Sequence, residues 1–288
     1  MKIACIGGAH IDRHGVLKAP LVPGTSNPGN VTTDFGGVAR NVAENLARLG
    51  REVVMVSLVG RDDAGALVVA HLRSVGVDTS LMGAAARATS SYTAILQPDG
   101  ELVLGLADMD LYEKITPAML EPGLPRLREC DAWFVDANLP PETLVWLARE
   151  KGTRLFAADA VSVPKSERLK GILGEISPLF LNRAQAETIG GVGEAASGVL
   201  TAGPRGVLAW VGKENRTMTA LPAKPRDVTG AGDALIAGTL FCLTGGEGFF
   251  DAVRFGVAAA AITVESANTV APQISADLVY ARLADNRP

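Results

Sequence analysis

Residues 226–235 read RDVTGAGDAL and place two glycines and an aspartate directly before an almost unbroken apolar run. The run continues to Leu243, and the pair Gly245-Gly246 that follows it is a common way to end a helix. An apolar segment of this length predicts a buried helix that begins near Gly232. The glycines and Asp233 therefore fall at the start of that helix.

The first turn of a helix leaves backbone N–H groups unpaired and carries the positive end of the helix dipole. Gly230 and Gly232 would let an anion approach those amides closely. Asp233 stands beside the same position, where a carboxylate can take a proton from an attacking hydroxyl. The stretch predicts a phosphoryl-transfer site, and the simpler interpretation, an acid that only caps the helix, stays open.

The composition excludes several classes of protein. The chain has 288 residues, a formal net charge of -4 and a pI of about 5.5, so its overall field does not attract nucleic acid or an anionic membrane. Met1 runs into Gly7-Gly8 without a signal-peptide pattern, and the longest weakly polar stretch, residues 255–264, is too short to cross a bilayer. We expect a soluble cytoplasmic protein with neither a nucleic-acid nor a membrane partner.

The three cysteines, Cys5, Cys130 and Cys242, lie in apolar surroundings and have no paired spacing. They fit reduced core residues better than a disulfide framework or a zinc site. The three histidines supply no metal-binding motif either.

Apolar runs of strand length alternate along the chain with segments of helical period. This alternation predicts an α/β fold with a mostly parallel sheet covered by helices on both faces. The expected strands are residues 2–8, 53–59, 131–136, 154–158, 179–181, 199–202 and 207–211, and the clearest expected helices are residues 38–49, 67–75 and 144–148.

Two segments break this rhythm. Residues 15–35 mix Pro, Gly, Thr and Val without helical period, and residues 91–106 suggest two strands around the turn Pro98-Asp99-Gly100. We infer a single domain, residues 1–288, with a small β lid contributed by about residues 13–35 and 88–110. Exposed strand edges on such a lid would be protected by a second copy, so we also expect a homodimer through the lid.

The stretch Asp-Val-Thr-Gly-Ala-Gly-Asp resembles the C-terminal signature of the ribokinase-like, PfkB-type carbohydrate kinases, and FGGVARNVAENLARLG (35–50) resembles their N-terminal signature. The resemblance implies a ribokinase-like three-layer α/β/α fold and an ATP-dependent kinase. It makes Asp233 the catalytic base and the backbone of Gly230, Ala231 and Gly232 the anion hole. Asp227 matches a residue that helps to hold a monovalent cation such as K⁺ in many members.

The same resemblance implies binding residues for both substrates. Asp12, Gly37 and Asn41 match positions that contact sugar hydroxyls, and a carboxylate is a sensible ligand for a diol. On the nucleotide side, LTAGPRGVLAW (200–210) looks like the loop that approaches ATP, and the matching residues there and in residues 258–270 are Thr201, Gly203, Gly206 and Asn268. By themselves these stretches are also compatible with a plain hairpin and with tight helix packing.

One departure concerns the metal. The family usually has Asn-x-x-Glu, whereas this chain has Asn182-Arg183-Ala184-Gln185, with Glu187 two positions further on. The family glutamate helps to place Mg²⁺ around the phosphates, and a neutral Gln185 can hold a water but brings no charge. We therefore expect Asn182 on the nucleotide side and Gln185 and Glu187 near the metal, in an altered arrangement.

Finer features resemble the branch of the family that phosphorylates the 5′-hydroxyl of pseudouridine. They lie in residues 25–50, 106–120, 136–144 and 159–173. In this reading Ser26, Asn27 and Asp108 lie in or beside the lid and Asn138 ends a central strand, where open α/β sheets bind ligands. An amide such as Asn27 can offer a donor and an acceptor to a base edge.

Three alternatives remain open at this stage. The first is a kinase of the same family for another nucleoside or sugar, and the second is a non-catalytic nucleoside-binding protein that keeps the fold. The third is a nicotinamide-dependent oxidoreductase, which a strand leading into Gly7-Gly8 suggests. The opening lacks G-x-G-x-x-G, and G-x-x-x-x-G-K-[ST] does not occur either.

Overall fold

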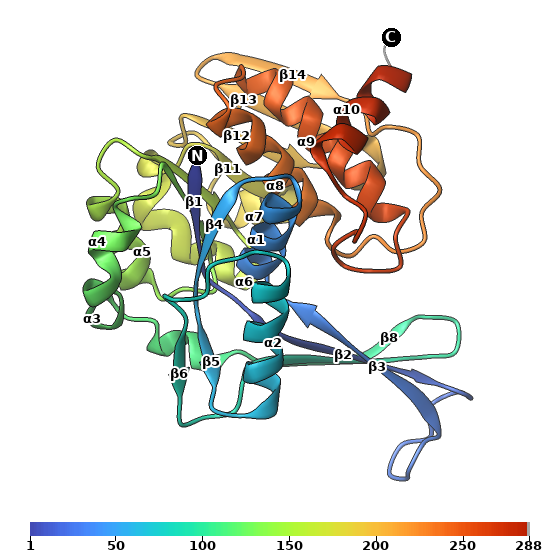
Figure 1. The fold of residues 1–288 in the computed structure, drawn as a ribbon. Coiled ribbons are helices and arrows are strands. Elements are labelled where there is room, and N and C mark those ends of the chain that lie inside the picture. Colours follow the sequence, from blue (N-terminus) through green and yellow to red (C-terminus); the bar gives the residue numbers. More distant parts are fainter. Residues whose placement is uncertain (287–288) are drawn as a thin grey trace.

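A computed structural model describes residues 1–286, and its main element is an eight-stranded sheet of order β14-β13-β12-β11-β10-β9-β1-β4 (Figure 1). The strands from β12 to β4 are parallel, and β13 and β14 are antiparallel additions at one edge. Their bounds are β1 (Lys2–Ile6), β4 (Glu52–Val56), β9 (Ala132–Asp136), β10 (Leu155–Asp159), β11 (Leu179–Asn182), β12 (Ser197–Thr201), β13 (Val207–Val211) and β14 (Glu214–Met218).

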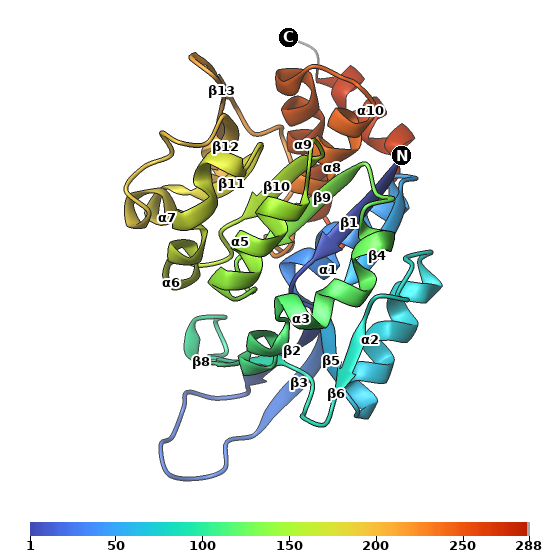
Figure 2. The same ribbon diagram turned by 90° about the vertical axis from the view of Figure 1, so that its left-hand side faces the viewer.

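Successive residues of each central strand enter different cores, so helices cover both faces. Figure 2 shows the helices on either side of the sheet. One layer contains α1 (Val38–Arg48), α2 (Asp63–Ser74), α8 (Ala231–Thr244), α9 (Phe249–Val264) and α10 (Ala276–Asp285). The other contains α3 (Pro117–Leu120), α4 (Leu124–Leu127), α5 (Pro141–Glu150), α6 (Val163–Ser166) and α7 (Arg183–Thr188), with the 3-10 turns η1 (Asp110–Lys114), η2 (Glu121–Gly123) and η3 (Glu167–Glu175).

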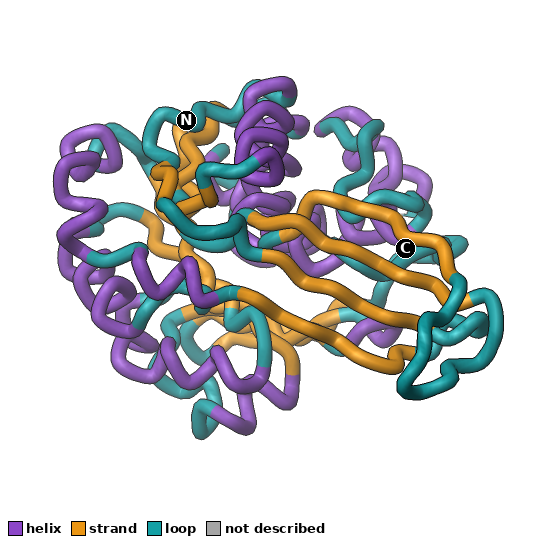
Figure 3. Tube along the Cα trace, turned by 90° about the horizontal axis from the view of Figure 1, so that it is seen from below, coloured by secondary structure: helices purple, strands orange, loops and turns teal. Residues whose placement is uncertain are grey.

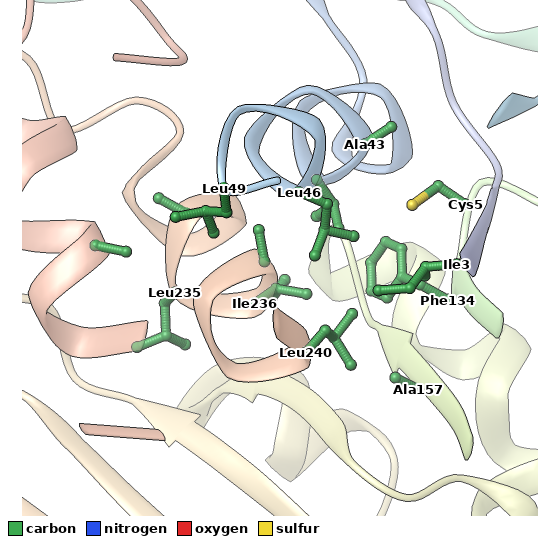
Figure 4. Close-up of a cluster of buried hydrophobic side chains, with 14 of the residues drawn as sticks. Ile3, Cys5, Ala43, Leu46, Leu49, Phe134, Ala157, Leu235, Ile236 and Leu240 are labelled. Atoms are coloured by element: carbon green, nitrogen blue, oxygen red, sulfur yellow. The ribbon is translucent and has the colours of Figure 1, made fainter. Parts of the chain in front are cut away.

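Helix α8 is buried in the first of these cores, as its sequence predicts. Ile236 and Leu240 pack toward α1 and the sheet, where Leu46 and Phe134 meet them, whereas Leu235 points away from α1 (Figure 4). On its other side α8 lies very close to α9, because Gly238 and Gly256 face each other. The packing of α1, α8 and α9 fixes where α8 begins, and the helix starts at Ala231, one residue before the predicted position.

A second sheet of four strands, called the lid sheet here, extends from the body (Figures 1 and 3). Its order is β3-β2-β7-β8, with β2 paired parallel to β7 and antiparallel to β3. The strands are β2 (His10–Leu17), β3 (Gly29–Gly36), β7 (Ser91–Leu96) and β8 (Leu102–Asp108). The predicted hairpin around Pro98-Asp99-Gly100 is present, while β2 begins at His10, three residues before the predicted lid boundary.

Two local differences from the predicted strands have clear causes. The expected strand 53–59 divides at Ser57, whose hydroxyl donates to the Gly7 oxygen (2.6 Å), and the chain then forms β5 (Leu58–Gly60) against β6 (Gly83–Ala85). Strand β14 was not predicted, because it is a polar edge strand whose residues are mostly exposed. Between β12 and β13 lies the 3-10 turn η4 (Gly203–Arg205).

Within residues 1–286, none of the helices combines the length and the apolar character that crossing a bilayer requires.

Candidate active site

Asp233 occupies the first turn of α8, and its carboxylate is held from another helix. Asn41 on α1 donates from Nδ2 to Asp233 Oδ2 at 2.6 Å, which joins residues 192 positions apart. Gly230, the residue before the helix, has φ 77°, and a side chain there would collide with the Thr269 carbonyl. The chain therefore needs glycine at this position to bring Asp233 to Asn41.

The amides at the start of α8 are available to an anion. Ala234 N–H donates the first intrahelical bond, to the Gly230 oxygen (2.9 Å), so the N–H groups of Gly232 and Asp233 precede the helical ladder. A side chain at Gly232 would meet nothing within 4 Å, and Gly232 lines a pocket, so this turn of the helix is accessible to a ligand. Ala231 N–H points back to the Val228 oxygen (3.3 Å), which leaves it less free than the predicted anion hole requires.

A pocket of about 690 Å³ opens beside this helix start, a size that suits a small-molecule ligand. Of the predicted nucleotide residues, Thr201, Gly203 and Gly206 are among the described residues that line it, whereas Asn182 and Asn268 are outside that lining. The lining is mostly apolar, as the flat faces of a base require, and consists of Thr201, Gly203, Pro204, Gly206, Val207, Ala220, Leu221, Pro222, Ala223, Pro225, Val228, Ala231, Gly232, Leu235, Val257, Ala260, Ala261 and Val264.

The residues predicted for the metal ions, Gln185, Glu187 and Asp227, are each bonded to another protein group and do not gather around a common point. The Asn182 side chain accepts from Gln185 N–H (3.0 Å) and the Gln185 side chain accepts from Asn182 N–H (2.7 Å), a capping box at the start of α7. Exposed Glu187 pairs with Arg183 (3.0 Å), and Asp227 accepts from Thr229 N–H (2.8 Å). Within residues 1–286 the structure gathers no group of three or more His, Cys, Asp or Glu that could hold a metal ion.

The predicted sugar ligands Asp12, Gly37 and Asn41 are outside the lining of this pocket, and Asn41 contacts Asp233. Gly37 precedes α1 at φ 103°, where a side chain would collide with the Gly8 carbonyl, and this close approach brings α1 against the end of β1. Asp12 lies on β2 of the lid sheet, and its carboxylate fills the space that Gly36 leaves by having no side chain. Asp12, Gly37 and Asn41 therefore form one wall that faces Asp233.

A buried ion pair fixes the orientation of Asn41. Arg40, only 2% exposed, donates from Nε to Asn41 Oδ1 (2.9 Å), which turns the Asn41 amide nitrogen toward Asp233. The Arg40 guanidinium pairs with Glu44 (2.6 Å), which also contacts Arg48 and His71. The charge of Arg40 is thus balanced, and its buried position is stabilised by hydrogen bonds on every side.

Asp136, the last residue of β9, is completely buried and organises the bottom of the site. Its carboxylate accepts backbone N–H groups from Gly8 (2.9 Å), Ala39 (3.0 Å) and Asn138 (2.9 Å). A side chain at Gly7 would collide with this carboxylate. Asp136 thus connects the end of β1, the first turn of α1 and the end of β9.

The crowding of carboxylates changes their acidity. Burial, together with the charges of Asp136 and Asp12, raises the pKa of Asp233 to about 7 against the opposing effects of Asn41 and Arg40. Burial and the charge of Asp233 raise the pKa of Asp159, the last residue of β10, to about 8. At neutral pH Asp159 therefore retains a proton more readily than Asp233 does.

The backbone beside Asp159 is strained. Val161 has φ 58°, an unfavourable conformation for a β-branched residue, and its N–H donates to Asp159 Oδ1 (2.7 Å). Strain of this kind often occurs at functional sites.

The four residues expected to recognise a base are placed differently from one another. Asn138 is buried at the end of β9, and its side-chain oxygen accepts from Lys165. Asn27 uses its amide within its own loop, on Val22 and Thr25. Exposed Ser26 lies in the same loop between β2 and β3. This loop begins after Leu17, which is five residues and about 16 Å along β2 from Asp12.

Asp108 lies on the opposite face of the lid sheet from Asp12. It pairs across the strands with Ser91, which pairs with Ile11, so its side chain shares the face of Ile11 and not that of its neighbour Asp12. Arg87 contacts it at 3.6 Å. Of the four, Asn138 is the one that the structure brings next to the other site residues.

Sequence reasoning missed Asp136, Asp159 and Arg40. The first two could have been found, because each is an acid that ends a buried apolar strand at the carboxyl edge of a parallel sheet. Arg40 gives no such signal, since a single arginine on an amphipathic helix is usually exposed.

Comparison with known proteins matches this arrangement to one family. The description "pfkB family carbohydrate kinase" matches residues 1–276. A pseudouridine kinase of Escherichia coli (strain K12) is 30% identical over an alignment of 295 positions, which covers 95% of this chain and 93% of that protein.

Two solved structures are similar over nearly the whole chain. A carbohydrate kinase from Agrobacterium tumefaciens has a TM-score of 0.89 at 39% identity and covers 98% of this chain and 97% of its own. Ribokinase of Arabidopsis thaliana, complexed with ribose and ATP, has a TM-score of 0.88 with 98% of each chain covered, and at 19% identity this likeness concerns the fold alone.

Replacing Asp136 by Asn should destabilise the protein by about 2–4 kcal/mol, because an amide cannot accept three backbone N–H groups and its NH₂ would face at least one donor. Urea unfolding measures the loss. The matched control is Asp131→Asn, which touches a single N–H, that of Lys2, at the surface and should cost under about 1 kcal/mol. Equal losses in the two variants would contradict the organising role of Asp136.

Proposed function

The chain belongs to the pfkB family of carbohydrate kinases and is a phosphotransferase that acts on a hydroxyl group, and from this premise we propose that it transfers the γ-phosphate of ATP to the 5′-hydroxyl of pseudouridine. The family and the ribokinase-like fold predicted from the sequence are confirmed. The observation that carries the proposal is the 2.6 Å hydrogen bond between Asn41 and Asp233, which joins the predicted sugar wall to the helix start beside the pocket.

ATP, which kinases of this family are expected to use, would place its base in the apolar pocket and its phosphates at the start of α8. The open amides of Gly232 and Asp233 and the helix dipole would stabilise charge on the transferring group. Mg²⁺ bound to the phosphates would neutralise further charge, and because residues 1–286 contain no preformed metal cluster it would be held mainly by the nucleotide and water. Gln185 and Glu187 remain its proposed protein neighbours, and Asp227 that of K⁺.

The acceptor would lie on the other side of Asp233. Asp12, Gly37 and Asn41 would hold the ribose hydroxyls, and Asp233 would take the proton of the attacking 5′-hydroxyl as the new O–P bond forms. A base with a pKa of about 7 suits this task, because a large fraction is ionised at neutral pH and still accepts a proton readily. Asn138, held by Lys165, is the best placed of the predicted base-recognition residues.

A second candidate is a kinase of the same family with a sugar or another nucleoside as acceptor. Asn27 is satisfied within its own loop, and Asp108 faces away from Asp12, so two of the groups expected to read uracil are not directed at the sugar wall. A site that holds only the sugar would discriminate weakly among bases.

An acceptor panel tests both candidates. Release of ADP from ATP is measured with pseudouridine, uridine, adenosine, ribose and fructose, and the highest kcat/KM is expected for pseudouridine. A clear preference for ribose, fructose or adenosine would replace pseudouridine as the substrate. Tight nucleoside binding without ADP at high enzyme concentration would instead indicate a binding protein.

Asp233→Asn should lower kcat by about 10²- to 10⁴-fold with little change in the KM for ATP, because the amide keeps the shape but cannot accept the proton. The control is Asp251→Asn, an exposed acid in the first turn of α9 that is remote from the pocket lining. Near-normal turnover by the Asp233 variant would show that another group is the base.

The rise of kcat with pH should be centred near pH 7, because Asp233 must be ionised to act and its pKa is about 7. Asp136→Asn should move this rise to lower pH, since the charge of Asp136 is one of the causes that raise the pKa of Asp233. Asp159→Asn is the matched control and should leave it in place, because Asp159, with a pKa of about 8, is still protonated while Asp233 titrates. Identical profiles for all three proteins would contradict this electrostatic assignment.

A homodimer through the lid sheet belongs to the same proposal. On the face opposite Asp12, one cross-strand row contains Leu104, Ile95, Gly15 and Val31, and Leu104, Leu106 and Val31 are each more than half exposed. A second copy would cover these side chains. We expect a dimer by light scattering that Leu104→Lys with Leu106→Lys converts to a monomer, while Leu67→Lys on α2 does not.

A reducing compartment such as the cytoplasm fits the three cysteines, which are all buried and unpaired.

A further inference from the structure

Behind the proposed sugar ligand Asp12 lie two polar side chains that the proposed mechanism does not use. His10 is two residues before Asp12 on β2, so both side chains point to the same face of the lid sheet. His10 is 8% exposed, and Tyr112 in η1, which reaches it from the body of the protein, is completely buried.

The three side chains form a line. The His10 Nδ1 atom is 3.0 Å from the Tyr112 hydroxyl, and His10 Nε2 is 3.1 Å from Asp12 Oδ1. Asp12 Oδ1 is itself buried and has no well-aligned hydrogen bond from any residue in 1–286. An isolated buried carboxylate oxygen is costly, so its nearest nitrogen is the group expected to satisfy it.

The direction of the hydrogen bonds follows from the phenol. Burial, followed by the charge of Asp136, raises the pKa of Tyr112 well above its ordinary value, so the phenol keeps its proton. The Ala9 backbone N–H and the Ser90 hydroxyl both face the phenolic oxygen as donors, because each favours the ionised phenol, and this leaves the phenolic hydrogen for His10 Nδ1. Nδ1 is then the acceptor, and the ring hydrogen of a neutral His10 must be on Nε2, directed at Asp12.

The opposite tautomer is unfavourable here. With its hydrogen on Nδ1, His10 would place the lone pair of Nε2 3.1 Å from a carboxylate oxygen that is already without a partner. The pair His10 and Asp12 would then repel instead of attract.

We propose that Tyr112 and His10 are positioning residues that fix the Asp12 carboxylate for the acceptor: Tyr112 holds the tautomer of His10, and His10 holds Asp12 Oδ1. Asp12 Oδ2, which occupies the space beside Gly36, is thereby presented to a sugar hydroxyl. This inference rests on the proposed function, because it assumes that Asp12 binds the acceptor. The bond from His10 to Asp12 would shorten and align as the acceptor binds.

Tyr112→Phe tests the relay with the least change of shape. It should raise the KM for pseudouridine, and for ribose if ribose is the better acceptor, by on the order of tenfold, because the tautomer of His10 is no longer held. The kcat and the KM for ATP should stay within about twofold, since neither Asp233 nor the pocket is touched. The matched control is Tyr280→Phe, which removes a surface hydrogen bond to Glu247 (2.9 Å) and should change none of these values.

A second measurement needs no acceptor and therefore separates this inference from the proposed function. In protein labelled with ¹⁵N at histidine, the His10 signals are identified by their loss in His10→Gln. The wild type should show a protonated Nε2 and an unprotonated Nδ1, and Tyr112→Phe should give a mixture of tautomers.

The outcomes are distinct. A hydrogen on Nδ1 in the wild type, or an unchanged acceptor KM in Tyr112→Phe, overturns the relay. The expected tautomer together with no turnover of any acceptor overturns the proposed function alone. If Tyr112→Phe does not fold, the position of the ring hydrogen of His10 in the wild type still tests the relay, because that measurement does not need the variant.

Discussion

The active-site region depends on one buried negative charge, that of Asp136. Its carboxylate accepts N–H groups from Gly8 after β1, from Ala39 at the start of α1 and from Asn138, two residues after β9. The first two donors lie about a hundred or more positions away in the sequence. Glycines at positions 7 and 8 are required because side chains there would collide with Asp136 and Asn138. A charge at the crossing of these segments sets their positions more strictly than apolar packing would.

The same charge has an electrostatic consequence. Asp12, Asp136, Asp159 and Asp233 converge where β9 and β10 end and α8 begins. Positive charge comes from Lys165 near Asp136 and from Arg40, which Glu44 already balances. Of these, Asp233 and Asp159 have pKa values raised to about 7 and about 8, well above that of an isolated surface aspartate. The arrangement that positions the site is thus also what gives Asp233 a pKa suited to a base.

Much of this could be predicted from the sequence, for identifiable reasons. Buried parallel strands are short apolar runs, and α8 is an apolar run between glycines, so both are visible in the sequence. The polar edge strand β14 cannot be predicted in this way, because its residues are not typical of a strand and it forms only by pairing with β13. Asn182 and Gln185 have the spacing of a capping box, and the structure uses them as one, although the family resemblance pointed to the nucleotide for Asn182 and to the metal for Gln185. Asp136 was missed because a single acid after a strand is usually solvated, and only the fold brings three backbone donors to it.

The first turns of α1 and α8 both have backbone N–H groups without intrahelical partners, and the two helices differ in what lies next to these groups. Both α1 and α8 begin at a glycine with positive φ, so neither helix is capped by the side chain of its own N-cap residue. At α1, an amide of the first turn is satisfied by Asp136, an anion that belongs to the protein. At α8, no such protein anion is found among residues 1–286, and Ala231 and Gly232 line the pocket. Because a helix start favours an anion, a ligand anion would be stabilised at this end of α8. This difference, more than the glycine-rich motif alone, makes the start of α8 the place where phosphate would bind.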